Sequence, residues 1–235
     1  MAKKEKEEVE EVNENASVES RINWAEDVVD KNKNLLIASL IIVVVTVAAV
    51  FYWSKTNSEN ELEAQREIFP AQYYFGQDSI DIVLKGNSGN VIGVEEIADD
   101  YSGTKAGNLA NFYAGAAHLK KGNFEEAINF LKEFSSDDLL VQARAYSLIG
   151  DAYMELNQLG EAISYYKKAA DNKPTKQYTP RYLMKLGLAY ELNNDLASAA
   201  NSYDRIIKEF YSSSETENAK KYLALVNAKQ GKKAE

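Results

Sequence analysis

The residues that could support catalysis are few, and they are scattered along the chain. His118 is the only histidine among the 235 residues, and there is no cysteine. A Ser-His-Asp triad would have to use His118, and both a multi-histidine metal site and a thiolate nucleophile are excluded. Acidic pairs at Asp99 with Asp100 and at Asp137 with Asp138 lie near expected helix ends, where solvated carboxylates are common. The sequence thus predicts no catalytic residues, no metal ligands, no cofactor and no enzyme activity.

Two further features invite a ligand-binding interpretation without supporting one. The glycine-rich stretch GNSG at residues 86–89 lacks the spacing of a phosphate-binding loop. The chain contains 15 tyrosines, but most of them fall on the core positions of a repeat described below. A formal net charge of −9 argues against a general affinity for nucleic acid.

An apolar segment without any charge lies at residues 35–53, with the sequence LLIASLIIVVVTVAAVFYW. A helix of this length spans roughly 28 Å at about 1.5 Å per residue, close to the hydrocarbon thickness of a bilayer. Phe51, Tyr52 and Trp53 end it as an interfacial aromatic belt. A cleaved signal peptide would have a short basic leader and a shorter apolar run, and a buried core helix is rarely apolar on all sides. We predict a retained single-pass transmembrane helix.

The basic residues on either side of this span predict its orientation. Arg21, Lys31 and Lys33 precede the span, whereas Lys55 and Arg66 follow it. Lysine and arginine accumulate on the cytoplasmic side of a membrane, and acidic residues count little. The small excess favours an N-terminus in the cytoplasm and a large C-terminal part outside.

Residues 1–34 are predicted to be a cytoplasmic acidic tail that is largely disordered, because charged residues dominate its first twenty positions. Within this tail, residues 22–30 are predicted to form a short amphipathic helix on the membrane surface. Trp24, Val28 and Val29 would face the lipid.

A pattern of small and aromatic residues recurs three times between residues 108 and 211. Gly150 is followed after twelve residues by Ala162, and then by Tyr166 and Ala169. The same intervals occur in the series Gly115, Ala127, Leu131, Phe134 and in the series Gly187, Ala199, Tyr203, Ile206. Each copy is predicted to be two antiparallel helices joined by a short turn, with small residues where the axes approach and aromatic rings between them. Pro174 ends the second helix of the middle copy.

This pattern resembles the tetratricopeptide repeat, a helix-turn-helix unit with a period of 34 residues. The matching residues of the middle copy are Tyr146, Ile149, Gly150, Tyr153, Ala162, Tyr166, Ala169 and Pro174. In the first copy, Asn111 and His118 replace the usual bulky apolar or aromatic residues, and we interpret His118 as a packed core histidine. The predicted fold class is all-α, with a single N-terminal transmembrane helix, a tetratricopeptide-repeat α-solenoid and a C-terminal capping helix.

The predicted domain boundaries follow from these segments. They are residues 1–34 for the tail, 35–53 for the transmembrane helix, 54–107 for a helical linker and degenerate first repeat, 108–211 for three repeats, and 212–235 for a capping helix and tail. In the degenerate repeat, Pro70 is expected to kink or interrupt the first helix, residues 85–90 are expected to be a loop, and residues 90–108 are expected to hold the second helix. Ala219, Tyr222, Leu223 and Val226 of the capping helix are expected to cover the last repeat.

Stacked helical hairpins form a superhelix whose concave face is lined by the first helix of each pair. The resemblance implies a partner-binding groove formed by Leu109, Phe112, Ala116, Leu119, Arg144, Ser147, Asp151, Met154, Arg181, Met184, Leu188 and Glu191. Such a groove suits an extended peptide or an amphipathic helix. The lysine and asparagine that clamp the C-terminal carboxylate of cytosolic chaperones are absent from it. The sequence leaves open whether a partner or the chain's own N-terminal helices cover this face.

A short cytoplasmic tail, one span and an external repeat domain together resemble the YfgM-type family. Its members are ancillary subunits of the bacterial Sec translocon that work with a membrane-anchored periplasmic chaperone on emerging secretory proteins. The resemblance implies a bacterial inner-membrane protein with periplasmic repeats, and it implies translocon subunits, a chaperone and secretory clients as partners. It implies no small-molecule substrate and no nucleic acid. Two other scaffold functions stay open, namely envelope or outer-membrane assembly and an organelle import receptor with cytosolic repeats.

Overall fold

The structure, a computed structural model, describes the backbone of residues 2–231 and the side chains of residues 31–231 apart from residues 36 and 139. It divides into two compact units, residues 1–56 and residues 57–235. The predicted lipid contacts of Trp24, Val28 and Val29 lie outside the described side chains and stay predictions.

The first unit consists of the N-terminal part of a single helix, α1, which runs from Ala2 to Gly76. The tail that we expected to be largely disordered therefore has a helical backbone, since glutamate and lysine, both good helix formers, dominate it. Lys31–Gly76 contains a window with a mean hydropathy of 2.8, and none of that window is buried within the protein. Its exposed side chains include Leu40 and Val45, so this part of α1 is long and apolar enough to cross a membrane.

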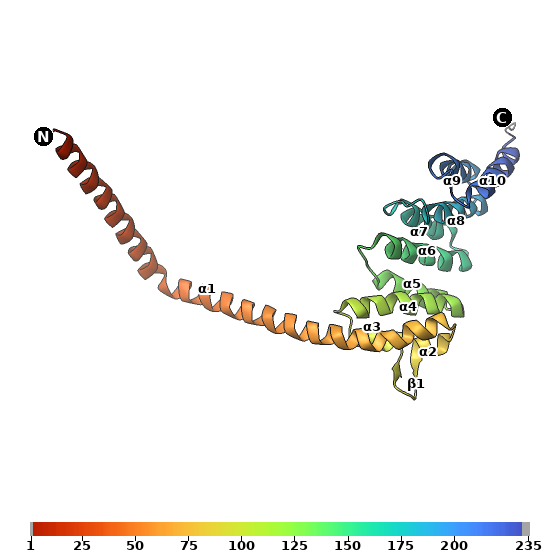
Figure 1. The fold of residues 1–235 in the computed structure, drawn as a ribbon, viewed down its shortest axis with the longest axis horizontal. Helices are drawn as coiled ribbons and strands as arrows, with labels where there is room; N and C mark the ends of the chain where they lie inside the picture. Colours follow the sequence, from red (N-terminus) through yellow and green to blue (C-terminus); the bar gives the residue numbers. More distant parts are fainter. Residues whose placement is uncertain (1, 232–235) are drawn as a thin grey trace. The chain divides into compact units, whose positions relative to one another are not determined.

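The second unit contains the end of α1, from residue 57, followed by a stack of short helices (Figure 1). The helices are α2 (Ile80–Lys85), α3 (Val94–Asp100), α4 (Lys105–Lys121), α5 (Phe124–Glu133), α6 (Leu139–Glu155), α7 (Leu159–Asp171), α8 (Thr179–Leu192), α9 (Leu196–Glu209) and α10 (Thr216–Lys229). A two-stranded antiparallel hairpin, β1 (Gly86–Asn87) and β2 (Val91–Ile92), separates α2 from α3. The architecture is therefore an all-α solenoid, as predicted.

The three predicted helical hairpins are α4 with α5, α6 with α7, and α8 with α9. Each hairpin turns at a residue with a left-handed backbone, and this residue always lies seven positions after the repeat glycine. These residues are Gly122 (φ 85°), Asn157 (φ 56°) and Asn194 (φ 59°). Glycine and asparagine adopt this conformation more readily than other residues, so the turn sequences set where each hairpin reverses.

Each repeat glycine packs directly against the side chain sixteen residues later. A Cβ atom placed on Gly150 would lie 2.7 Å from Cδ1 of Tyr166, which is far inside van der Waals contact. The equivalent distances are 2.5 Å from Gly115 to Cγ of Leu131 and 2.5 Å from Gly187 to Cε1 of Tyr203. The glycines are therefore required mainly by the residue at the sixteenth position, and at Gly115 the Ala127 carbonyl oxygen, 3.0 Å from the added Cβ, also shows the close approach at the twelfth.

The degenerate first repeat differs from the prediction in its second half. Its first helix is the end of α1, which continues through Pro70 to Gly76 because Ile68 and Ala71 are buried on either side of the proline. The second helix expected within residues 90–108 is the shorter α3, an additional helix, α2, precedes it, and the β-hairpin takes the place of the expected loop. Gly86 at the start of β1 has a φ of 74° and is followed by a turn-forming sequence. These pieces share one apolar core with α4, formed by Ala64, Ile68, Ala71, Val83, Leu84, Val94, Ile97, Ala98, Ala106, Ala110, Ala114 and Ala117.

Helix α10 covers the last hairpin through one face. Ala219 and Val226 are fully buried, and the Tyr222 ring stacks on Tyr203 with centroids 5.6 Å apart. Tyr222 itself stays 37% exposed, because no further helix packs over it within the described part of the chain. The apolar residues of α10 thus complete the core of the third hairpin.

We predict that Gly150→Ala destabilises the protein by about 1–3 kcal/mol, because the new methyl group would push the Tyr166 ring out of its place. Gly160→Ala is the matched control, since a Cβ there meets no atom within 4 Å and should leave stability unchanged or raise it slightly. Denaturant unfolding of the full chain in detergent, followed by circular dichroism, measures both. Equal stability of the two variants would contradict the glycine packing described here.

Candidate protein-binding groove

The first helices of the hairpins, α4, α6 and α8, carry the twelve residues expected in the groove. The structure brings several of them together in two clefts. One cleft, of about 360 Å³, is lined by Leu109, Phe112 and Arg144 together with Leu140, Tyr178 and Tyr182. The other, of about 690 Å³, is lined by Leu119, Asp151 and Met154 together with Tyr166 and Lys185. Residues from three successive first helices therefore contribute to one discontinuous surface.

Some predicted groove residues are instead inside the protein. Ser147 is 1% exposed and Ala116 is 7% exposed, so neither can contact a partner. Both are small residues at which neighbouring helices approach each other closely. Phe112 and Met184 are partly buried, and the Phe112 ring lies 5.3 Å from that of Phe134, so they serve the core as well as the surface.

Three of the four predicted charged residues, Asp151, Glu191 and Arg181, are paired within the chain. Asp151 accepts a hydrogen bond from the Tyr166 hydroxyl at 2.7 Å, and both of its oxygens lie 2.7 Å from Nζ of Lys185. Lys185 belongs to the following hairpin and also lies 3.3 Å from Oγ of Ser147. Burial and the neighbouring Asp151 carboxylate raise the pKa of Tyr166, so this hydroxyl stays protonated and donates.

The same kind of contact recurs one hairpin later. Glu191 accepts a hydrogen bond from the Tyr203 hydroxyl at 2.9 Å and pairs with Nζ of Lys229 at 2.8 Å. Burial and the hydrogen bond to Glu191 raise the pKa of Tyr203. In both cases a carboxylate on a first helix holds the tyrosine of its own hairpin and a lysine of the next unit. We call these contacts the carboxylate bridges.

The remaining predicted residues are exposed on α8. Arg181 pairs with Glu215 at 3.2 Å, whereas Leu188 is 48% exposed and has large apolar surface free of the core. The equivalent residue to Arg181 in the preceding hairpin is Arg144, which lies at the rim of the smaller cleft. The predicted groove thus consists of an apolar cleft at Leu109, a charged part closed by internal ion pairs, and separate exposed apolar surface at Leu188.

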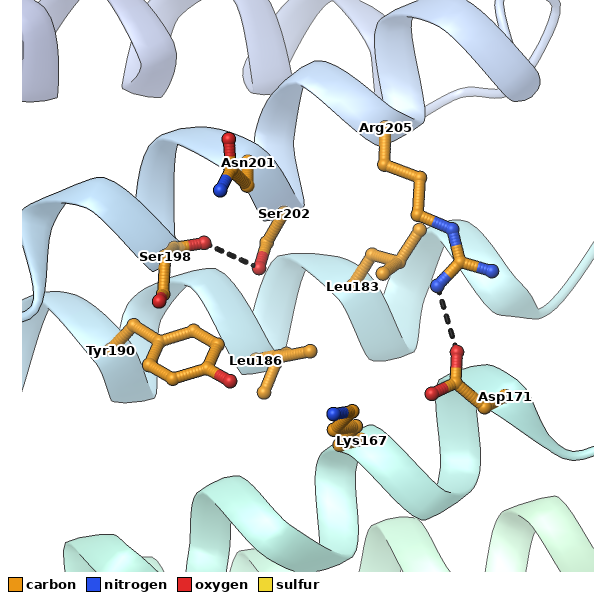
Figure 2. A pocket seen from close by; sticks show the side chains of 9 residues that line it. All are labelled: Lys167, Asp171, Leu183, Leu186, Tyr190, Ser198, Asn201, Ser202 and Arg205. Carbon is orange, nitrogen blue, oxygen red and sulfur yellow. Dashed lines mark hydrogen bonds and ion pairs between the residues drawn. The ribbon is translucent and has the colours of Figure 1, made fainter.

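A third cleft, of about 210 Å³, lies between α7, α8 and α9 and is lined by both polar and apolar side chains (Figure 2). Across it, Nη1 of Arg205 pairs with Asp171 at 2.8 Å, and Nε of the same side chain pairs with Glu209 at 3.0 Å. Burial opposes the charge of Arg205, but the hydrogen bonds to both carboxylates outweigh it and raise the pKa of the guanidinium. Because Arg205 is already paired with two carboxylates, we interpret this cleft as part of the contact between the second and third hairpins.

A cluster of tyrosines lies within the second hairpin, on α6 and α7, and Lys132 of α5 contacts it from the first hairpin. The Tyr153 and Tyr165 rings stack at 5.6 Å, and Tyr146 lies 6.4 Å from Tyr165. Nζ of Lys132 donates to the Tyr153 hydroxyl at 2.9 Å, which raises the pKa of the lysine. Lys168 lies over the Tyr165 ring at 4.3 Å. These tyrosines pack between helices, in agreement with their interpretation as spacers.

His118 is a packed residue, as the sequence indicated. Its Nε2 lies 2.9 Å from a carboxylate oxygen of Glu95, its Nδ1 lies 3.3 Å from the side-chain amide of Asn123, and its ring stacks on Phe130 at 5.4 Å. The side chain is 8% exposed. Glu95 also pairs with Lys85. Within the part of the chain that the structure describes, no group of three His, Asp or Glu residues is placed to hold a metal ion.

These features define an α-solenoid of helical hairpins, and the sequence comparisons give its class. A family model described as the tetratricopeptide repeat matches residues 112–177 and, in an overlapping second match, residues 150–215. The chain therefore carries tetratricopeptide repeats, and repeats of this kind are protein-interaction scaffolds that are typically not enzymes. Protein partners in general follow from the fold.

One relative is similar to about half of this chain. The uncharacterized protein ycf37 of Guillardia theta is 31% identical to this chain over 116 residues. The match covers 48% of this chain and 64% of that protein, so the chain spans less than two thirds of its relative. The name of that relative states no activity or partner.

We predict that Asp151→Ala costs about 1–3 kcal/mol of stability, because it leaves the Tyr166 hydroxyl and Lys185 without their acceptor. Adding Tyr166→Phe to this variant should cost less than Tyr166→Phe costs in the native chain. Glu155→Ala, on the same helix and exposed, is the control and should stay within about 0.5 kcal/mol. Strict additivity of Asp151→Ala and Tyr166→Phe in denaturant unfolding would show that the bridge contributes nothing.

Proposed function

We propose that the protein is a membrane-anchored, non-enzymatic scaffold that holds a protein partner against the first helices α4, α6 and α8. The observation that carries this proposal is the pair of clefts along these helices, which combine apolar surface with a few polar groups. Peptide segments bind to such surfaces by placing apolar side chains in the clefts and hydrogen-bonding around them. The open surface at Leu188 extends the same face along α8.

The anchor would be the apolar part of α1. Residues 35–53 carry exposed apolar side chains that no other part of the described chain covers, which is costly in water and favourable in lipid. The Thr46 hydroxyl in the middle of this segment is satisfied within the helix, since it donates to the Ile42 carbonyl at 2.7 Å. The flanking arginine and lysine residues support an N-terminus in the cytoplasm and repeats on the opposite side.

For the particular partner, we propose the Sec translocon of a bacterial inner membrane, together with a periplasmic chaperone or an emerging secretory client. The support is the order of tail, span and external repeats, which resembles the YfgM-type family. A scaffold for envelope or outer-membrane assembly and an organelle import receptor with cytosolic repeats use the same groove, and partner identity separates them from this proposal.

A photo-crosslinking residue in place of Leu188 tests the proposal in native membranes. Leu188 is 48% exposed on the first helix of its hairpin, and we expect its replacement to crosslink to a discrete protein partner, either a translocon subunit or a periplasmic chaperone. Tyr211 is the control, because it is 76% exposed but lies after the second helix α9. A partner captured equally from both positions, or none from Leu188, would refute a groove on the first helices. An envelope-assembly protein as the partner would refute the translocon assignment alone.

A further inference from the structure

The groove cleft of about 360 Å³ lies at the N-terminal ends of α6 and α8, beside α4. It differs from the rest of the groove in its charge. Its walls are apolar or aromatic, and the single charged residue that lines it is Arg144. No acidic residue lines it. By contrast, the larger cleft contains Asp151 and Glu155 together with three lysines.

Arg144 is unusual because its charge is not neutralised by the part of the chain that the structure describes. The equivalent residue of the next hairpin, Arg181, is held by Glu215 at 3.2 Å. Nearly all other basic side chains of the solenoid's first helices are also paired, as Lys185 is with Asp151. Arg144 has no such carboxylate and is exposed at the edge of an apolar cleft. An unpaired cation in this position stabilises a bound anion more than a cation that already has a counter-ion does.

Tyrosine hydroxyls supply further donors beside the guanidinium. Tyr113, Tyr178 and Tyr182 line the same cleft, and none of their hydroxyls is hydrogen-bonded within the described residues. Among buried polar side-chain atoms of this part of the chain, only Oε1 of Gln230 lacks a partner, so the three hydroxyls are accessible to solvent. Burial raises the pKa of Tyr182, and the nearby charge of Arg144 partly offsets this. Burial also raises the pKa of Tyr113, so the hydroxyls of Tyr113 and Tyr182 are protonated at neutral pH and able to donate.

We propose that this cleft binds a partner segment that presents one large apolar side chain next to an aspartate or glutamate. The apolar side chain would fill the cleft between Leu109 and Tyr182, and the carboxylate would pair with Arg144 and accept a hydrogen bond from a tyrosine hydroxyl. The proposal rests on the proposed function, because it specifies the chemistry of a partner held in the groove.

An internal acidic residue fits this cleft better than an acidic chain end. A C-terminal aspartate or glutamate carries two carboxylates, whereas Arg144 is the one cation that lines the cleft. A segment that continues in both directions can also reach the larger cleft, which a terminus in this position could do from one side only.

The test uses the full-length protein in detergent micelles and a fluorescein-labelled peptide, GSDFSGS, with acetylated and amidated ends. We expect the peptide to bind, and we expect asparagine in place of its aspartate, or alanine in place of its phenylalanine, to weaken binding at least about tenfold. Arg144→Gln should weaken the aspartate peptide to the level of the asparagine peptide and leave the asparagine peptide unchanged. Lys208→Gln removes an exposed, paired cation on the second helix α9, and as the control it should leave binding of both peptides unchanged. Fluorescence anisotropy measures the affinities.

Several results would overturn the proposal. They are no measurable binding of the aspartate peptide, equal loss of both peptides in Arg144→Gln, or tighter binding of a peptide that ends in a free carboxylate. Arg144→Lys keeps a charge and should retain part of the affinity, which guards against a folding defect in Arg144→Gln. If a partner crosslinks at position 188 but the affinity for the aspartate peptide does not change in Arg144→Gln, only this proposal fails. If no partner crosslinks, the proposed function fails whatever the peptide does.

Discussion

The close contact between a glycine and a bulky side chain sets the geometry of every hairpin in this protein. Gly150 lies against the face of the Tyr166 ring, and the neighbouring hairpins repeat this contact with Leu131 and Tyr203. Any larger residue would push the two helices apart or displace the ring. Because each hairpin stacks on the next, the spacing of α4, α6 and α8, and with it the shape of both clefts, depends on these contacts.

The carboxylate bridges join each unit of the stack to the one that follows it in the chain. Asp151 and Glu191 each hold a tyrosine of their own hairpin and a lysine of the following unit, so the second and third hairpins and α10 are joined in series. The first hairpin has Leu131 instead of the tyrosine, and it is joined to the second by apolar contacts and by the hydrogen bond from Lys132 to Tyr153. The bridges also neutralise charges that would otherwise be free to bind a partner. Arg144 lies outside them and stays available.

The repeated part of the fold could be predicted because its signal is local. Intervals of twelve, sixteen and nineteen residues after each glycine repeat three times, and they place Tyr166 and Tyr203 in the core correctly. The degenerate repeat could not be predicted in detail, since one copy gives no period and its β-hairpin interrupts the helical pattern. Burial of Ser147 was missed because a groove position assigned by resemblance ignores how closely neighbouring helices approach. The pairing of Asp151 with Lys185 joins residues of different hairpins, which spacing within one repeat cannot reveal.

The glycine packing determines which side of each first helix faces outward. Thiol labelling of that side and of the buried side tests this directly. The natural chain has no cysteine, so a single introduced thiol can be followed without background. In the full-length protein, Leu188→Cys should react rapidly with a maleimide, because Leu188 is 48% exposed. Ser147→Cys should stay protected until denaturant is added, because Ser147 is 1% exposed. Rapid labelling of Ser147→Cys in a protein that still shows native helical content would contradict the account.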